Sequence, residues 1–199
     1  MKKPLLITLG VIVGLVVIVS MMFGGVYNKL VAGEEGVKSA WAQVENVYQR
    51  RADLVPNLVN TVKGFAAQEK DVLQGVVEAR ANATSMQVNA GDIVNDPQAL
   101  EKFQALQGEL SSALSRLLVT VERYPELKSS QNFLALQTQL EGTENRVAVE
   151  RRRFNEVAQA FNTVRRQFPN VLVANLFGFR EKAYFKSAEG ASVAPTVQF

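Results

Sequence analysis

The sequence predicts an all-α protein, in which an N-terminal transmembrane helix precedes an antiparallel up-down-up-down four-helix bundle whose first and last helices are long and coiled-coil-like. Three observations support this fold class. A long uncharged run lies near the N-terminus, apolar residues recur at 3,4 spacing in four later stretches, and the connections between them are short, without strand-like alternation. A chain of 199 residues accommodates one such anchor and one domain.

The composition excludes several kinds of chemistry. The chain has no cysteine and no histidine, so disulfides, thiol nucleophiles, zinc–thiolate sites and the commonest general base are all missing. Lys2 and Lys3 precede the anchor, which leaves 22 − 2 = 20 basic residues against 19 acidic ones. Such a balance gives no positive electrostatic field that would attract nucleic acid. We therefore expect no cofactor and no nucleic-acid partner.

Residues 1–4 form a short basic N-terminus, and Leu5–Tyr27 is predicted to be the transmembrane helix. This run carries no charge and is long enough to cross a hydrocarbon core of about 30 Å. A cleaved signal peptide is the alternative, but the run exceeds the usual h-region of roughly 7–15 residues and no A-x-A-like site follows. Gly10 and Gly14 form a small-xxx-small pair that would let two anchors approach closely.

The first bundle helix follows the glycines at 33 and 36 and shows a heptad pattern. Arg51 is the one charged residue on its seam, and Pro56 lies inside it without disturbing the phase, which predicts a kinked but continuous helix. The a positions are Trp41, Tyr48, Val55 and Val62, and the d positions are Val44, Arg51, Leu58 and Phe65.

Two shorter helices are predicted in the middle of the chain. Apolar spacing marks one over residues 72–88 and another over residues 100–124. Between them the run from Asn89 to Pro97 reads as a loop, with Asp96 placed to cap the following helix and Pro97 at its first position.

The last bundle helix is predicted over residues 133–168, and the bundle as a whole over residues 28–169. Glu150 breaks its seam, because an ionised carboxylate on a dry seam is costly unless it is paired. In antiparallel helices Arg51 and Glu150 lie about 14 and 17 residues from the distal ends, so we expect them to form a structural ion pair. The a positions are Phe133, Leu140, Val147, Phe154, Phe161 and Phe168, and the d positions are Leu136, Thr143, Glu150, Val157 and Val164.

Residues 170–186 are predicted to form a short apolar and basic helical segment. The interpretation that we favour folds it over the open end of the bundle; the alternative places it on the membrane surface, against anionic headgroups. The candidate membrane-contact residues are Leu172, Leu176, Phe177, Phe179, Arg180 and Lys182. Residues 187–199 are predicted to be a flexible tail, either without function or ending in a Φ-x-Φ ligand for a PDZ-type groove, with Val197 and Phe199 as its apolar positions.

Four motifs carry a resemblance to a known family. They are YNKLV at 27–31, YQRRADLVPNLVNTVKGF at 48–65, YPELKSSQNFLALQTQLEGTENRVAVERRRFNE at 124–156 and FPNVLVANLFGF at 168–179. Together with the N-terminal anchor, these motifs closely resemble the LemA family of bacterial membrane proteins. The resemblance implies a single-pass membrane protein with an α-helical bundle, and it implies no enzyme activity and no catalytic residues.

The leading hypothesis for function is a membrane-anchored scaffold or interaction protein that self-associates, since long heptad helices pair between chains as easily as within one. Its partners would be the lipid bilayer, further copies of the chain, and other membrane or envelope proteins. The rival hypothesis is a metal-binding or enzymatic bundle built on the carboxylates of Asp53, Glu141, Glu144 and Glu150, although bundle metal sites usually add a histidine. A third is lipid-surface sensing through residues 171–186.

The expected location is the bacterial inner membrane, crossed once. Lys2 and Lys3 favour a cytoplasmic N-terminus and hence a domain on the periplasmic or external side. Lys29 and Lys38 follow the anchor closely and favour the reverse. We expect the external orientation.

Overall fold

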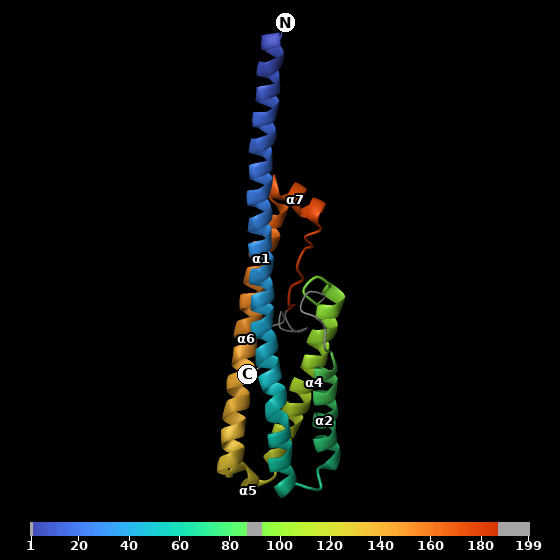
Figure 1. Ribbon diagram of the computed structural model, residues 1–199. Helices are drawn as coiled ribbons and strands as arrows, with labels where there is room; N and C mark the ends of the chain where they lie inside the picture. The colour runs from blue at the N-terminus through green and yellow to red at the C-terminus, as the bar shows by residue number, and fades with distance from the viewer. Residues whose placement is uncertain (1, 87–92, 187–199) are drawn as a thin grey trace, which may run out of the picture.

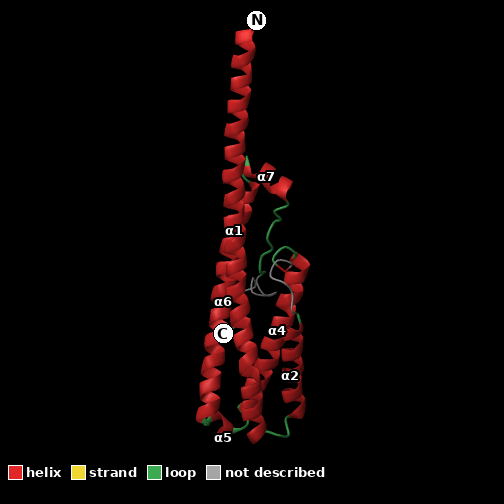
Figure 2. Ribbon diagram, viewed as in Figure 1, coloured by secondary structure: helices red, strands yellow, loops and turns green. Residues whose placement is uncertain are grey.

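The computed structural model describes residues 2–86 and 93–186, and all regular structure in these two ranges is α-helical. Helix α1 runs the length of the molecule, α6 lies along its C-terminal part, and α2 and α4 lie beside the end farthest from the N-terminus (Figures 1 and 2). The elements are α1 (Lys2–Phe65), α2 (Lys70–Ser85), α4 (Pro97–Val121), α5 (Pro125–Lys128), α6 (Gln131–Arg166) and α7 (Asn170–Phe177).

Helix α1 is one unbroken helix of 64 residues that joins the apolar N-terminal run to the core. It is the one helix among the described residues that is long and apolar enough to cross a membrane. Pro56 lies inside it, as the heptad phase predicted. Because proline has no N–H, the carbonyl of Ala52 loses its helical donor, and Nε of Arg80 in α2 donates to that carbonyl at 2.7 Å.

The start of α4 follows the predicted capping chemistry. The side chain of Asp96 accepts a hydrogen bond from the backbone N–H of Gln98 at 2.8 Å, and Pro97 is the first helical residue. The short helix α5 then closes the distal end of the molecule, where the side chain of Leu127 is fully buried.

Most of the predicted heptad seam of α6 is buried. Its a positions from Phe133 to Phe161 lie in the core. Phe168 does not: α6 ends at Arg166, and the Phe168 side chain is exposed in the turn before α7, so the seam was extended too far. The d positions are less regular, because Thr143 is buried whereas Leu136, Glu150, Val157 and Val164 are half-buried.

The four longer helices alternate in direction along the chain (Figure 1). Their closest backbone neighbours are α1 with α6 and α2 with α4, and α2 also packs on α1. Toward the N-terminal end, α1 and α6 continue beyond α2 and α4, as the lengths of the predicted helices require (Figure 1).

The buried apolar residues form two clusters, one on either side of Arg51. The proximal core, nearer the apolar N-terminal run, is aromatic and centres on Trp41, Phe103, Phe154 and Phe185. The distal core is mainly aliphatic, with Phe133 as its buried aromatic residue, and includes Leu58, Val62, Leu110, Leu114, Leu117 and Leu140.

A correction concerns residues 170–186, which were predicted to be helical throughout. Helix α7 ends at Phe177, because Gly178 has a φ of 75°, a left-handed conformation that favours glycine. Residues 178–186 then run without regular structure from α7 back toward α4 (Figure 1). We name this segment the strap.

Candidate functional site

A buried polar network marks the boundary between the two cores. The guanidinium of Arg51 is buried, and its Nη1 donates to Oγ of Ser111 at 2.7 Å and to Oε1 of Glu144 at 2.8 Å. Its Nη2 donates to the backbone carbonyl and to the side-chain carbonyl of Gln107. Nε of Gln107 in turn donates to the carbonyl of Ala83 at 3.1 Å, so the network ties α1, α2, α4 and α6 together.

The predicted ion pair of Arg51 with Glu150 is wrong, and Glu144 is the partner instead. Arg51 lies 65 − 51 = 14 residues from the distal end of α1, and Glu144 lies 144 − 131 = 13 residues from the start of α6. Glu150 lies 150 − 131 = 19 residues from that start, about 7.5 Å farther along than Arg51. Glu150 is half-buried, and its nearest cation is Nη1 of Arg153 on its own helix, at 3.9 Å.

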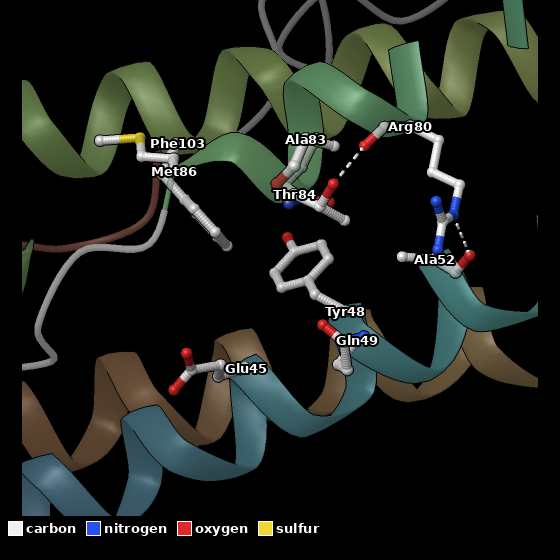
Figure 3. Close-up of a pocket in the computed structure, with 10 residues that line it drawn as sticks. Glu45, Tyr48, Gln49, Ala52, Arg80, Ala83, Thr84, Met86 and Phe103 are labelled. Atoms are coloured by element: carbon white, nitrogen blue, oxygen red, sulfur yellow. Dashed lines mark hydrogen bonds between the residues drawn. The ribbon is translucent and has the colours of Figure 1, made fainter. Parts of the chain in front are cut away.

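A pocket of about 630 Å³ lies beside this network, between α1 and the α2–α4 pair. Figure 3 shows the ring of Tyr48 directed from α1 toward Ala83 and Thr84 of α2. Burial raises the pKa of the Tyr48 phenol above its ordinary value, although the positive charges of Arg151 and Arg51 oppose this. Arg80 also lines the pocket but is engaged by the Ala52 carbonyl (Figure 3).

Side-chain amides hold the backbone of the strap. Asn162 of α6 accepts from the N–H of Lys182 at 2.8 Å and donates to its carbonyl at 2.9 Å. Asn155 makes the same pair of bonds with Phe185, at 2.9 and 3.0 Å. Seven residues of helix span about 10.5 Å, and three residues of extended chain span about 10 Å, so the two amides match the strap in spacing.

The strap ends in a third amide contact and a basic clamp. Gln104 of α4 donates to the carbonyl of Lys186 at 3.0 Å and accepts from its N–H at 3.3 Å. Arg151 donates to the same carbonyl at 2.9 Å and lies over the ring of Phe185. Arg151 is half-buried, whereas Arg152 and Arg153 are exposed.

Lys182 places a buried cation inside the proximal core. Its Nζ pairs with Glu34 of α1, donates to Oδ1 of Asn95 at 2.7 Å, and lies 5.0 Å from the ring centre of Phe161. This ion pair joins the strap to α1 about two turns beyond the last residue of the predicted anchor, Tyr27.

The candidate membrane-contact residues divide into two groups. Leu172, Leu176, Phe177 and Arg180 are exposed. Phe179 and Lys182 are buried, so their assignment to a membrane contact is wrong: Phe179 packs on the ring of Tyr27, and Lys182 faces Glu34. The exposed residues therefore form a smaller surface, confined to α7 and the start of the strap.

The carboxylates proposed for a metal-binding bundle do not meet. Glu144 is bound to Arg51, Asp53 accepts from Gln49, and Glu141 accepts from Gln137. Within residues 2–86 and 93–186 no group of three or more acidic side chains is placed to hold a metal ion.

Comparison with known proteins now identifies the family. The LemA family model matches residues 40–199, which is most of the chain. The chain belongs to the LemA family. The matched range begins near Trp41 and includes the Arg51 network, α6, α7 and the strap.

Curated relatives of this LemA chain share about a quarter of its residues. Magnetosome protein MamQ of Magnetospirillum gryphiswaldense is 26% identical over 174 residues, covering 80% of this chain and 64% of the relative. Magnetosome protein MamQ 2 of Paramagnetospirillum magneticum is 25% identical over 175 residues, with the same coverage. Protein LemA of Metamycoplasma hominis is 21% identical over 168 residues, covering 84% of this chain and 72% of the relative. The LemA chain thus spans 64% of the length of both magnetosome relatives.

Sequence reasoning missed the residues that hold the strap. Asn155 and Asn162 lie seven residues apart, on one face of α6. Two asparagines separated by one heptad are the signal that could have revealed these residues. The pair of Glu34 with Lys182 joins residues 148 positions apart and left no local signal. Val197 and Phe199, the candidate tail ligand, lie outside the described residues.

Proposed function

We propose that this LemA chain is a membrane-anchored scaffold, which holds a helical platform at a fixed height above the bilayer for other proteins and for further copies of itself. The continuity of α1 carries this proposal. From Tyr27 to Phe65 the helix spans 65 − 27 = 38 residues, or about 57 Å, without a linker. A domain joined to its anchor in this way stands off the membrane as a rigid rod.

The use of the polar residues also supports a binding role rather than catalysis. Arg51, Lys182, Asn155 and Asn162 are each engaged in joining one element to another. In this proposal α1, α2, α4 and α6 act together as one four-helix unit, with the Arg51 network setting their relative level.

Self-association would begin in the anchor. A Cβ added at Gly10 or at Gly14 meets nothing within 4 Å, so this face of α1 is open to a second helix. Size measurement of the full-length protein in mild detergent tests the proposal, and dimers or larger particles are expected. Replacing both glycines by leucine should shift the particles toward monomers, whereas Gly25→Leu serves as the matched control. A strictly monomeric wild-type protein would overturn self-association.

We further propose that the anchor lies in the bacterial inner membrane with the platform on the periplasmic or external side. The basic residues at 2 and 3 support this orientation. Protease treatment of intact spheroplasts should cleave the platform, and full protection until the membrane is broken would reverse the orientation.

Contact with the lipid surface is a second candidate function, favoured by α7. Leu172, Leu176 and Phe177 are exposed on this helix, while Val173 and Ala174 on its other side are buried in the proximal core. A short helix with an apolar outer face beside the end of a membrane anchor is suited to lie in the headgroup layer.

A further inference from the structure

Helix α7 forms one wall of a cleft at the membrane end of α1. The cleft has a volume of about 370 Å³, within the range of roughly 300–1,000 Å³ that small-molecule sites have. Phe23, Gly24, Tyr27 and Asn28 line it from α1, and Leu176 and Phe177 line it from α7. Its walls are therefore almost entirely carbon, and Asn28 supplies the one amide.

The shape of the cleft follows from two residues of α1. Gly24 has no side chain, and a Cβ built there meets nothing within 4 Å, so it leaves an open floor. One helical turn later, the ring of Tyr27 packs edge-on against Phe177, with ring centres 4.9 Å apart, and closes the end that faces the proximal core.

The position of the cleft decides what fills it. Phe23 and Tyr27 belong to the last two turns of the apolar run Leu5–Tyr27, so the cleft lies where a spanning helix leaves the hydrocarbon. Tyrosine is enriched at that level of the bilayer. The solvent that surrounds an apolar cleft there is lipid rather than water.

An exposed cation lies next to the cleft. Arg180 follows Phe179, whose ring packs on Tyr27 of the cleft wall, and the Arg180 side chain is exposed. Arg166 is also exposed, and only a loose contact of 3.9 Å joins it to Glu181. These cations suit an anionic headgroup.

We propose that this cleft binds one anionic phospholipid, with an acyl chain between α1 and α7 and the headgroup beside Arg180. The proposal rests on the second candidate function, the lipid contact of α7, and assigns it a site. The clamped strap supports the site, because Asn162 and Lys182 fix the chain that follows α7 and so hold the wall of the cleft in place.

The first measurement tests the lipid contact itself in the full-length protein. Because the chain has no cysteine, Leu172→Cys and Val119→Cys each accept one fluorophore; both side chains are exposed and apolar, but Val119, at 72% exposure, lies on α4 at the distal end. In vesicles with a spin-labelled headgroup quencher, the label at 172 should be quenched and the label at 119 should not. Equal emission at the two sites would overturn both the contact and the cleft.

The second measurement tests the cleft. A Cβ at position 24 meets nothing within 4 Å, so leucine there would extend into the floor of the cleft, whereas Gly25→Leu changes the neighbouring glycine, which does not line it. By native mass spectrometry with added phosphatidylglycerol, Gly24→Leu should lower the fraction of lipid-bound protein about tenfold, the loss of about two buried methylenes, and Gly25→Leu should not. If Gly24→Leu retains as much lipid as Gly25→Leu, the cleft is not the site, even if Leu172 contacts the bilayer.

The third measurement tests the headgroup. Arg180→Gln should reduce the preference for phosphatidylglycerol over phosphatidylcholine while leaving the acyl-chain cleft intact. Equal retention of the two lipids by the wild-type protein would overturn the anionic part of the proposal. Self-association is measured separately by particle size, so none of these results decides the scaffold proposal.

Discussion

The proximal and distal cores are closed by different means. In the distal core, four helices and α5 surround mainly aliphatic side chains, and packing between helices closes the core. In the proximal core, α2 is absent, and a non-helical strap fills the space beside α1 and α6 with Phe179, Ala183 and Phe185. A strap has free backbone groups that a helix satisfies internally, so this half needs asparagine and glutamine side chains to bind them. The distal core is therefore specified by apolar pattern, and the proximal core by polar groups placed one by one.

The largest expected effect falls on the network between the two cores. Glu144→Ala leaves the buried guanidinium of Arg51 without its counter-charge, and should lower the free energy of unfolding by about 3 kcal/mol. This loss is at the low end of the range for breaking a buried ion pair, because the Glu144 side chain is 41% exposed and Arg51 keeps its hydrogen bonds to Ser111 and Gln107. Denaturant titration measures the change. Glu150→Ala is the control and should cost less than about 1 kcal/mol; the reverse order would restore the Glu150 pairing.

The next effect should be confined to the proximal core. Asn162→Ala strands the buried N–H and carbonyl of Lys182, and should cost about 2 kcal/mol. Hydrogen exchange should accelerate in the strap while the distal core of the same molecule stays protected. Asn145→Ala, an exposed asparagine of the same helix, should change neither. Uniform acceleration across both cores would mean that they unfold as one unit.

A distal test concerns the proline of α1. Arg80→Met removes the donor to the Ala52 carbonyl, and should cost about 1 kcal/mol. In a Pro56→Ala background the residue at 56 supplies its own N–H to that carbonyl, so the same Arg80→Met change should cost much less. A double-mutant cycle measures the coupling. Additive effects would show that Arg80 acts independently of the proline.

The arginine triplet of α6 gives a smaller contrast. Arg151→Ala removes the bond to the Lys186 carbonyl and the contact with the Phe185 ring, and should cost about 1 kcal/mol. Arg152 is exposed, and Arg152→Ala should remain within about ±0.5 kcal/mol. Thermal melts compare the two. If Arg152→Ala instead lowers only the particle size, that outer face belongs to an interface between copies.

The smallest effect is a pH dependence of the proximal core. Burial raises the pKa of Tyr48 in the folded protein above the ordinary 10.0, so the unfolded chain loses this proton first. The contribution of Tyr48 to stability is complete below pH 10.0 and is lost as the pH rises through the raised value. Tyr48→Phe should therefore flatten the alkaline fall of the unfolding midpoint. An unchanged fall would assign it to other groups.

The sequence predicted the helices and most of their buried faces, because apolar residues at alternating spacings of three and four mark the side of a helix that is buried. Trp41, Val55, Phe133 and Phe154 are all buried where the heptads put them. The partner of Arg51 was harder to predict, since Glu144 and Glu150 lie within two turns of each other and only the true helix start decides between them. The estimate counted from Phe133, whereas α6 begins at Gln131 and brings Glu144 level with Arg51.

Apolar periodicity could not predict the strap, for a physical reason. Its buried positions are Phe179, Lys182, Ala183 and Phe185. The first three follow the i, i+3, i+4 spacing of a helix, so periodicity alone extends α7 through residues that are not helical. The groups that bind it are amides, which an apolar pattern does not register. A buried lysine contradicts an apolar pattern, and its counter-charge, Glu34, lies far away in the sequence. The same reason explains why only part of the candidate membrane surface is exposed. The sequence predicted a helix over α7, and it wrongly predicted that this helix continues through the strap.

Helix α1 also fixes the rotational phase between the anchor and the platform. From Gly14 to Trp41 is 41 − 14 = 27 residues, and from Gly10 to Val37 is also 37 − 10 = 27 residues, or about 7.5 helical turns in each case. The half turn places the glycine face of the anchor opposite Val37 and Trp41 of the proximal core. Two anchors paired through these glycines would stand back to back, with both proximal cores directed away from the contact between the anchors. Inserting one residue between Gly14 and Phe23, before the contacts of α1 with α7 begin, would turn the platform by about 100° relative to the glycine face of the anchor.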